Sequence, residues 1–270
     1  MIFASDLDRT LMYSSRAIEE LGEPKESTLK PVEQKDGRWV GYMTEAAYLT
    51  LKELSLQSLF VPVTTRTTEQ FNRFVIFEQE IPIKYAITSN GATILYRGVP
   101  LEEWSSHIHN CLHTESVTQA ELLASLHREG FRLDGVKKQA ENLFFYYILN
   151  CLPAASEKDS INDFAAKYGW RISLQGRKLY FIPQAISKGS ALEYICNHEG
   201  VKAIAGAGDS VLDWDFLKNC QHRFVPNHGE LAKELARVSG TENHILTKNN
   251  SVTAGEEILN QFLKLIPLKI

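Results

Sequence analysis

The sequence predicts an α/β fold in which a doubly wound parallel sheet carries a smaller inserted α/β domain. Over residues 1–90 and 184–270, short apolar runs alternate with amphipathic segments, which is the pattern of a parallel sheet wrapped by helices. Residues 91–183 instead combine short strands and short helices of their own. We therefore expect a discontinuous core formed by 1–90 and 184–270, with 91–183 folded separately.

Length and composition are those of a soluble globular protein. The 270 residues exceed the usual size of one domain, and hydrophobic and charged residues make up 44% and 23% of the chain. The net charge is −4 and no block of Lys and Arg occurs, so nucleic acid and membranes are not expected partners. No apolar stretch approaches the length of a membrane span, and the features of a signal peptide are missing. Together with four scattered cysteines that lack metal-binding spacing, this predicts a cytoplasmic protein.

The first half of the core is predicted from four segments. Residues 1–5 are apolar and form the first strand, and residues 59–63 form the second. A helix is predicted over 44–57, where apolar residues recur at helical spacing and a threonine can cap the start. The insertion 29–42 carries Asp36-Gly37 at its middle, a strong turn signal that predicts a protruding hairpin near the end of the first strand.

The middle third predicts a small sheet with its own helices. The run Phe144–Leu149 is apolar on both faces, as expected of a central strand. Further short elements are expected at 93–96, 119–129, 143–149, 161–168 and 179–182.

After Ser187 the alternation of the parallel sheet resumes. Helices are expected at 188–198, 213–219, 229–238 and 254–265, and strands at 203–205, 223–225 and 244–246.

The first motif lies at the end of the first strand, where the apolar run leads into Asp6-x-Asp8-x-Thr10. Because side chains in a strand have a period of two, Asp6 and Asp8 would point the same way if the strand continued, and at its frayed carboxyl end both can reach one ligand. Two like charges this close are costly to desolvate unless a cation lies between them. The alternative is a pair of solvated turn carboxylates, with Thr10 capping the next helix.

A second carboxylate motif, from Gly206 to Asp213, follows another apolar strand. The carboxyl ends of parallel strands open on one crevice, so Asp209 and Asp213 are expected to face Asp6 and Asp8 across it. Four carboxylates require a metal, and an all-oxygen site favours a hard dication, Mg²⁺ first, over zinc. The alternative is a Gly-rich turn followed by a helix that an aspartate caps.

Two smaller signals accompany these motifs. Thr64 ends the second strand beside Thr65 and Arg66, and a hydroxyl with backbone N–H groups at a helix start is suited to phosphate oxygens. Lys188 opens the helix that follows the inserted segment. A lone lysine is more often a solvated surface charge, but this one stands where the chain returns to the core.

Taken together, these motifs resemble those of the haloacid dehalogenase superfamily in order and approximate spacing. The matching segments are Asp6-x-Asp8-x-Thr10, Thr64, Lys188 and Gly208-Asp209-x-x-x-Asp213. The insertion, with Asn90-Gly91-Ala92 at its entry, resembles the C2 (type IIB) α/β cap of the Cof-type, sucrose-phosphatase-like branch. The resemblance covers nearly the whole chain and implies a Rossmann-like core with a cap domain.

The resemblance also implies roles for the matching residues. Asp6 is similar to the nucleophile of the superfamily and Asp8 to its general acid and base, while Thr64 and Lys188 match the positions that hold phosphate during catalysis. The implied Mg²⁺ ligands are Asp6, Asp8, Asp209 and Asp213. Further candidates for phosphate or substrate binding are Thr10, Thr65, Arg66, Asn90, Gly91, Arg177 and Lys178.

Three positions depart from the pattern of the superfamily. Arg9 stands where glycine is common, Thr65 replaces the glycine of a Thr-Gly-Arg sequence, and Leu212 stands where many Cof-type members have asparagine. Each reacting group is still present. The departures set the chain apart from the characterised subfamilies.

The residues and the resemblance predict an enzyme, a Mg²⁺-dependent phosphatase that hydrolyses a small phosphorylated metabolite through an aspartyl-phosphate intermediate. A sugar phosphate is the expected substrate. Two alternatives stay open: a phosphomutase acting on a sugar phosphate, and a non-catalytic regulator that binds a phosphorylated ligand. Release of phosphate to water separates a phosphatase from a mutase, and the presence of both Asp6 and Asp8 argues against the regulator.

Overall fold

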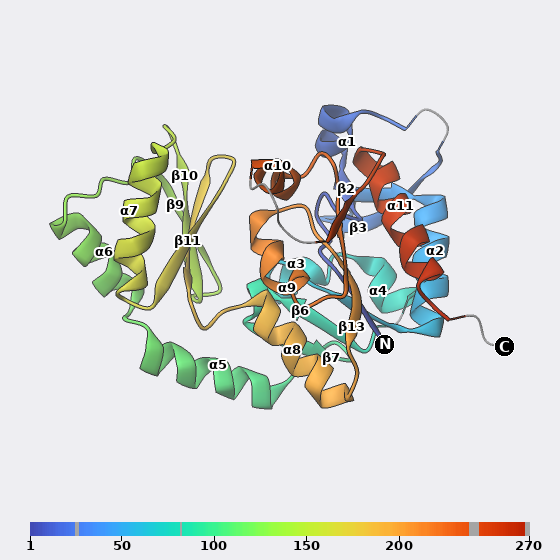
Figure 1. Cartoon of the computed structure of the whole chain (residues 1–270), viewed down its shortest axis with the longest axis horizontal. Helices are drawn as coiled ribbons and strands as arrows, with labels where there is room; N and C mark the ends of the chain where they lie inside the picture. Colours follow the sequence, from blue (N-terminus) through green and yellow to red (C-terminus); the bar gives the residue numbers. More distant parts are fainter. Residues whose placement is uncertain (25–26, 82, 238–242, 268–270) are drawn as a thin grey trace. The chain divides into compact units, whose positions relative to one another are not determined.

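The computed structural model describes residues 1–24, 27–81, 83–237 and 243–267, and its chain divides into two compact units (Figure 1). The first unit comprises Met1–Pro100 and Lys188–Ile270, and the second is the segment Leu101–Ser187 between them. The assignment of 91–183 to a functional cap stays a prediction. By its contacts, the second unit begins at Leu101, because the strand at 93–96 pairs with a strand of the first unit.

A five-stranded parallel sheet forms the centre of the first unit, in the order β15-β14-β13-β1-β5. The strands are β1 (Ile2–Ser5), β5 (Leu59–Pro62), β13 (Ala203–Ala207), β14 (His222–Val225) and β15 (His244–Leu246). β1 pairs with β5 on one side and with β13 on the other, and all four of its residues are buried. The predicted α/β fold with a parallel sheet is therefore confirmed.

Helices lie on both sides of this sheet (Figure 1). On one side α2 (Glu45–Gln57) packs against α11 (Ser251–Lys264), and on the other α8 (Lys188–Glu199) packs against α9 (Trp214–Leu217). Thr44 caps α2 as predicted, since its side chain accepts a hydrogen bond from the backbone N–H of Ala47 at 3.0 Å. The predicted helix 213–219 is shorter, because a 3₁₀ turn (Val211–Asp213) precedes α9. The predicted helix 229–238 is present as α10 (Glu230–Arg237). Residue 238, the last of the predicted range, lies outside the described residues.

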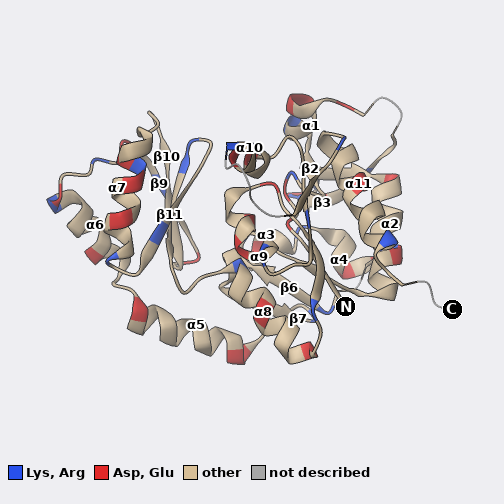
Figure 2. Cartoon of the chain, in the orientation of Figure 1, with Lys and Arg blue, Asp and Glu red and all other residues tan. Residues whose placement is uncertain are grey.

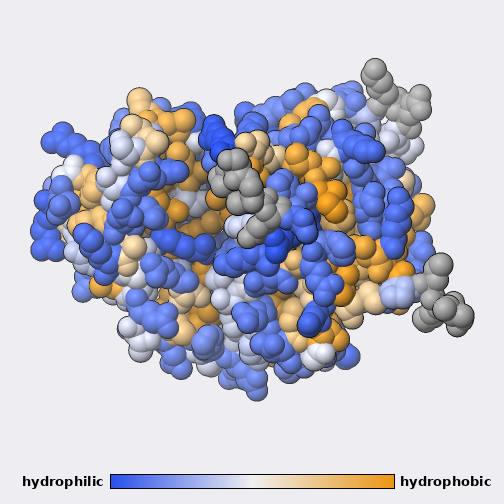
Figure 3. Space-filling view, viewed as in Figure 1, coloured by the Kyte–Doolittle hydropathy of each residue, from blue (hydrophilic) through white to orange (hydrophobic). Residues whose placement is uncertain are grey.

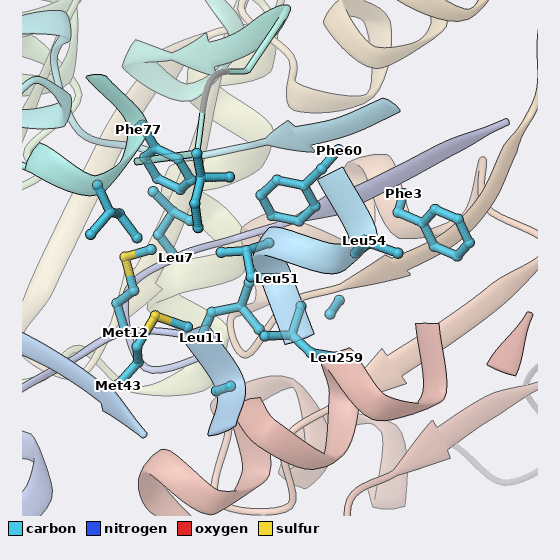
Figure 4. Packing of buried hydrophobic residues seen from close by; sticks show 14 of the residues in the cluster. Phe3, Leu7, Leu11, Met12, Met43, Leu51, Leu54, Phe60, Phe77 and Leu259 are labelled. Carbon is cyan, nitrogen blue, oxygen red and sulfur yellow. The ribbon is translucent and has the colours of Figure 1, made fainter. Parts of the chain in front are cut away.

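The core of the first unit fills the space between the sheet and the α2–α11 pair. Figure 4 shows Leu51 and Leu54 of α2 among Phe3, Phe60 and Leu259, and all five side chains are at most 2% exposed. Burying apolar area of this kind is the main favourable contribution to folding. It also fixes the end of β1, from which the first aspartate of the site emerges.

The predicted hairpin is present as β3 (Leu29–Lys35) and β4 (Arg38–Thr44). Asp36 and Gly37 have φ angles of 50° and 74°, as a two-residue turn with a positive φ at both positions requires. The short strand β2 (Tyr13–Ser14) pairs with β4, so that the hairpin belongs to a three-stranded sheet, and α1 (Ser15–Leu21) follows β2.

Between β5 and the second unit, the chain forms two short helices and a second small sheet. The helices are α3 (Thr68–Phe71) and α4 (Val75–Gln79), and the strands are β6 (Tyr85–Thr88), β7 (Thr93–Tyr96) and β8 (Val99–Pro100). A 3₁₀ turn over Ser89–Gly91 links β6 to β7. A bridge between Val63 and Ile87 places the end of β6 beside the end of β5.

The second unit is an antiparallel sheet with three helices. The strands are β9 (Gly135–Ala140), β10 (Phe144–Leu149), β11 (Trp170–Gln175) and β12 (Lys178–Pro183), in the order β11-β12-β10-β9, and the helices are α5 (Glu102–Glu115), α6 (Gln119–Arg128) and α7 (Ala155–Ala166). The predicted central position of β10 is confirmed. The rings of Phe145 and Phe181 stack in its core with centroids 4.8 Å apart.

The surface carries charges of both signs on both units (Figure 2), and hydrophilic side chains cover most of the face drawn in Figure 3. Among the described residues, every helix falls short of the length or the hydropathy that crossing a membrane requires.

The core of the first unit predicts unequal effects for two leucines of α2. Leu51 is fully buried and Leu56 is 79% exposed. Leu51→Ala should lower the free energy of unfolding by about 2–5 kcal/mol because it leaves a cavity, while Leu56→Ala should change it by less than about 0.5 kcal/mol. Chemical denaturation of both variants measures the difference. Equal effects would contradict the packing described for α2.

Candidate active site

The predicted site residues of the core follow the carboxyl ends of three adjacent strands. Asp6 comes directly after β1, Asp209 follows β13, and Thr64 follows β5. The backbone N–H of Asp6 donates to the carbonyl of Ala207 at 2.9 Å, which ties the first motif to the strand before the second. The crevice at this end of a parallel sheet is where α/β folds bind their ligands.

Three carboxylates meet there. Each of Asp6, Asp209 and Asp213 offers an oxygen, and these atoms lie within 4.8 Å of one another. Gly208 makes this approach possible, because a Cβ in its place would lie 2.3 Å from the Cβ of Asp213. The loop thereby folds back on itself, and Asp213 Oδ2 accepts a hydrogen bond from the backbone N–H of Ser210 at 2.9 Å.

Lys188 lies among these carboxylates. Its Nζ is 2.6 Å from Asp213 Oδ1 and 3.1 Å from Asp6 Oδ1, and its side chain is only 1% exposed. This lysine is therefore not the solvated surface charge that a lone lysine usually is. Burial lowers the pKa of Lys188, but the charges of Asp213 and Asp6 outweigh burial and raise it overall, so the side chain is cationic.

The carboxylates carry more charge than Lys188 neutralises. Burial is the largest cause that raises the pKa of Asp6, followed by the charge of Asp213, and the pKa reaches about 8 in spite of Lys188. Burial and the charge of Asp6 likewise raise the pKa of Asp209 well above its ordinary value. When all three carboxylates are ionised, one lysine leaves a net charge of −2. An all-oxygen donor set with this charge fits a hard divalent cation.

Two threonines border the carboxylates. Thr10 is fully buried, and its hydroxyl donates to Asp6 Oδ2 at 3.3 Å. It caps no helix, since Ser14 caps α1. Thr64 is also fully buried, its hydroxyl accepts from the backbone N–H of Arg66 at 3.1 Å, and Thr65 is half-buried in the same loop.

Asp8 does not join the group of three carboxylates. β1 ends at Ser5, and Asp8 turns its carboxylate to Arg66, which donates to both oxygens at 2.6 Å. The strand period of two no longer applies after Ser5, so a ligand shared by Asp6 and Asp8 stays a prediction.

Asn90 and Gly91 lie on a tightly turned loop beside Thr64. The backbone N–H of Asn90 donates to the carbonyl of Thr64 at 3.1 Å. Ser89, Asn90 and Gly91 have consecutive positive φ angles of 50°, 59° and 100°, a costly conformation for the first two. The amide of Asn90 is 1% exposed, and neither its nitrogen nor its oxygen has a hydrogen-bond partner among the described residues.

The two candidates near the end of the inserted segment belong to the second unit. Arg177 lies in the turn between β11 and β12, and its Nε donates to the carbonyl of Leu149 at 2.8 Å. Lys178 begins β12, with Nζ 5.8 Å from the centre of the Tyr146 ring. Both side chains are exposed, and their part in substrate binding stays a prediction.

The structure adds residues that the sequence did not point to. Glu33, from the hairpin, accepts a hydrogen bond from Nη2 of Arg66 at 3.0 Å, the same nitrogen that donates to Asp8. His228 donates from Nε2 to the carbonyl of Arg9 at 2.9 Å, which supports the loop after Asp8. Arg9 has a φ of 61°, which explains why glycine suits this position in the superfamily that the sequence resembles. Strand alternation marks Glu33 only as one more polar residue, so no sequence signal distinguishes it.

The crowding of the carboxylates predicts a pH-dependent stability. The pKa of Asp6 rises from 3.8 to about 8 on folding, so the folded chain holds a proton that the unfolded chain has lost between these values. Stability should therefore fall as the pH rises from about 4 to 8 in the absence of divalent cations. Asp6→Asn should remove this loss and raise the Tm at pH 8 by roughly 3–6 °C, equivalent to about 1–2 kcal/mol.

Thermal melts in a chelator at pH 5 and pH 8 check this prediction. Adding Mg²⁺ should raise the Tm of the unsubstituted chain at pH 8 more than that of Asp6→Asn, because binding to the folded state stabilises it. A Tm for Asp6→Asn below that of the unsubstituted chain at pH 8 in chelator would contradict the repulsion.

Over nearly its whole length, the chain is similar in structure to two phosphatases and a hydrolase. The sucrose-phosphatase from Synechocystis sp. PCC6803, in complex with sucrose and phosphate, matches with a TM-score of 0.68 and 14% identity over 97% of both chains. The haloacid dehalogenase-like hydrolase yhjK from Bacillus subtilis matches with a TM-score of 0.59 and 16% identity, over 99% of this chain and 92% of the other. BT4131, a sugar phosphatase of subclass IIB, matches with a TM-score of 0.56 and 12% identity over 97% and 98%.

Sequence comparison alone does not reach this result, since no protein-family model and no curated protein matches the chain. The matching features are the parallel five-stranded sheet and the separate antiparallel unit inserted into it. The chain therefore has the fold of the subclass IIB sugar phosphatases of the haloacid dehalogenase superfamily.

Proposed function

We propose that this chain is a Mg²⁺-dependent phosphatase that hydrolyses a small phosphorylated metabolite, with sugar phosphates as the substrate class. The observation that carries the proposal is the buried group of Asp6, Asp209 and Asp213 around Lys188 at the carboxyl end of the sheet. Structural carboxylates seldom gather in this way, because each one raises the cost of ionising the others. In a site for a dication and a phosphate, the negative charge of the carboxylates has a purpose, because it holds the dication.

Asp6 is the proposed nucleophile. Its carboxylate attacks phosphorus, forming an aspartyl phosphate while the bond between phosphorus and the ester oxygen breaks. Attack requires the ionised carboxylate, whereas burial beside Asp213 and Asp209 favours the protonated form. A bound Mg²⁺, held by Asp6, Asp209 and the backbone carbonyl of Asp8, would supply the positive charge that keeps Asp6 ionised and screens the phosphate.

Asp8 is the proposed acid and base. It protonates the leaving oxygen as the ester bond breaks, and then accepts a proton from the water that attacks the aspartyl phosphate. Its side chain is 47% exposed, more than that of Asp6, so a substrate oxygen can reach it. Release of phosphate restores Asp6, and the protonation states balance over one cycle.

Lys188 and Thr64 are proposed to hold the phosphoryl oxygens. Lys188 is cationic, buried and already 3.1 Å from Asp6 Oδ1, so it can stabilise charge that moves between the nucleophile and the phosphate. The buried amide of Asn90, next to Thr64, has no hydrogen-bond partner in the described part of the chain. It is a further candidate, since it can donate to a phosphate oxygen and so become satisfied. Thr10, which donates to Asp6, and Thr65 and Gly91, which lie next to Thr64 and Asn90 in the chain, complete the proposed set.

The substrate class rests on the similar structures. The sucrose-phosphatase binds sucrose and phosphate, and BT4131 is a sugar phosphatase. At identities of 12–14% these matches support the class of substrate and leave its identity to experiment.

Asp6→Asn tests the chemistry directly. It should lower kcat by at least about 10³-fold, because no neighbouring group can replace the nucleophile, while the fold persists. The measurement is release of inorganic phosphate from a panel of sugar phosphates, with Mg²⁺ and with chelator. Asp36→Asn, in the exposed hairpin turn, is the matched control and should leave the rate unchanged.

Phosphate release by Asp6→Asn at the same rate as by the control variant would contradict the proposed mechanism. Transfer of the phosphate to a second sugar hydroxyl, without release to water, would identify a mutase. A protein that binds sugar phosphates and turns over none of them would be a regulator.

The second unit is proposed to select the leaving group, because the core residues contact only the phosphoryl group that all substrates share. Arg177→Ala and Lys178→Ala should then reduce kcat/KM for the preferred sugar phosphate by about 10-fold and leave that for nitrophenyl phosphate within about 2-fold. Both substrates are measured with both variants. Equal losses on the two substrates, or no loss on either, would place selection elsewhere.

A further inference from the structure

We infer that Glu33, carried by the β3–β4 hairpin, is a positioning residue for the proposed acid and base: it holds Arg66, and Arg66 holds the carboxylate of Asp8. The inference rests on the proposed function and assigns the hairpin a part in it. It also changes the expected role of Arg66 from a phosphate ligand to a support for Asp8.

Arg66 grips Asp8 with two parallel hydrogen bonds. Its Nε donates to Asp8 Oδ2 and its Nη2 to Asp8 Oδ1, each at 2.6 Å. Two parallel bonds between a planar guanidinium and a carboxylate fix the direction of the carboxylate as well as its distance. A single bond from a lysine would leave the carboxylate free to rotate.

Glu33 binds the adjacent edge of the same guanidinium, and the two edges share Nη2. Arg66 Nη2 donates to Glu33 Oε2 at 3.0 Å, and Nη1 donates to Glu33 Oε1. The guanidinium also lies over the ring of Phe74, with 4.3 Å between Cζ and the ring centre. Two edges and one face are thus occupied, which leaves Arg66 little freedom to turn toward a phosphate.

The hairpin is shaped to deliver Glu33. The pairing of β3 with β4 shifts register on both sides of Glu33, a bulge that redirects the side chain. Gly41 on the facing strand leaves room, since a Cβ there would lie 2.7 Å from the Cβ of Glu33 and 2.8 Å from its Oε2. Glu33 also forms a β-bridge with Phe74, and the backbone N–H of Gln34 donates to the carbonyl of Arg73 at 2.9 Å.

Exposure rises along this chain of contacts. The side chains of Glu33, Arg66 and Asp8 are 7%, 18% and 47% exposed. The contacts with Arg66 occupy both oxygens of Glu33, whereas the Asp8 carboxylate is open to a substrate. Burying a carboxylate is costly unless it is paired, and Glu33 is paired with Arg66, the residue that also orients Asp8. In this arrangement Glu33 is the supporting carboxylate and Asp8 is the reacting one.

Loss of Glu33 should misdirect Asp8 without removing it. Arg66 would keep its bonds to Asp8 but could swing with it, and a displacement of this kind costs between about 10- and 100-fold in rate. The loss should be greatest where the leaving oxygen needs a proton. Loss of Glu33 should not weaken substrate binding, because in this inference neither Glu33 nor Arg66 contacts the phosphate.

The experiment compares Glu33→Gln with the unsubstituted chain on two esters. On a sugar phosphate, whose leaving oxygen needs a proton, kcat should fall about 10-fold or more and KM should stay within about 2-fold. On nitrophenyl phosphate kcat should fall less than about 3-fold. Glu199→Gln is the matched control, since Glu199 also forms a partly buried ion pair, with Lys84 at 2.8 Å, and should leave both rates unchanged.

A double-variant cycle isolates the route through Asp8. In an Asp8→Asn background, Glu33→Gln should cause no further loss, because the residue it positions is already disabled. Additive losses, equal losses on the two esters, or a raised KM at unchanged kcat would each overturn the inference. The last result would return Arg66 to phosphate binding.

A structural readout keeps this inference distinct from the proposed function. If the unsubstituted chain releases phosphate from no ester, the phosphatase proposal fails on its own. Crystal structures of the Glu33→Gln chain and, where it folds, the Glu33→Ala chain then decide the positioning. An Asp8 carboxylate displaced together with Arg66 supports it, and an unchanged position of both side chains overturns it.

Discussion

The site depends on the mutual repulsion of three carboxylates at the end of the central strand. Asp6, Asp209 and Asp213 are brought within 4.8 Å by backbone that the core holds in place, and one buried lysine offsets only part of their charge. The folded chain therefore carries an electrostatic strain that a dication relieves. The same strain gives the proposed chemistry its metal dependence, because Asp6 can act as a nucleophile only in its ionised form.

The core was predictable from sequence because its elements have strong local signals. β1 and β13 are apolar runs that end in carboxylates, and α2 combines helical periodicity with a threonine cap. In the second unit, α5 and β9 were missed for a physical reason. α5 buries only Trp104 and Ile108 over four turns, and β9 is a polar edge strand whose residues are mostly exposed, so neither shows the periodicity that marks a buried face.

The sequence predicted which residues form the candidate site better than it predicted where their side chains point. Asp6, Lys188 and Asp209 follow from position along strands and helices, but the direction of Asp8 depends on a turn at Arg9 that strand periodicity cannot represent. The role of Glu33 could not be predicted from sequence, since its side chain is turned inward by a bulge and by the space above Gly41 on the facing strand. Such features arise from pairing between segments, whereas sequence patterns report on one segment at a time.

The interruption of the first unit has a consequence for synthesis of the chain on the ribosome. β1 pairs with β5, but its other neighbour is β13, where Ile2 lies opposite Ala203. At translation rates of about 5–20 residues per second, β13 emerges roughly 7–30 s after β5, far longer than the microseconds that a local hairpin needs to form. For that interval one edge of β1 has no partner, and the second unit has time to fold before the sheet around it closes. During that interval the exposed edge of β1 is open to pairing with another chain, and it closes only when β13 joins the sheet.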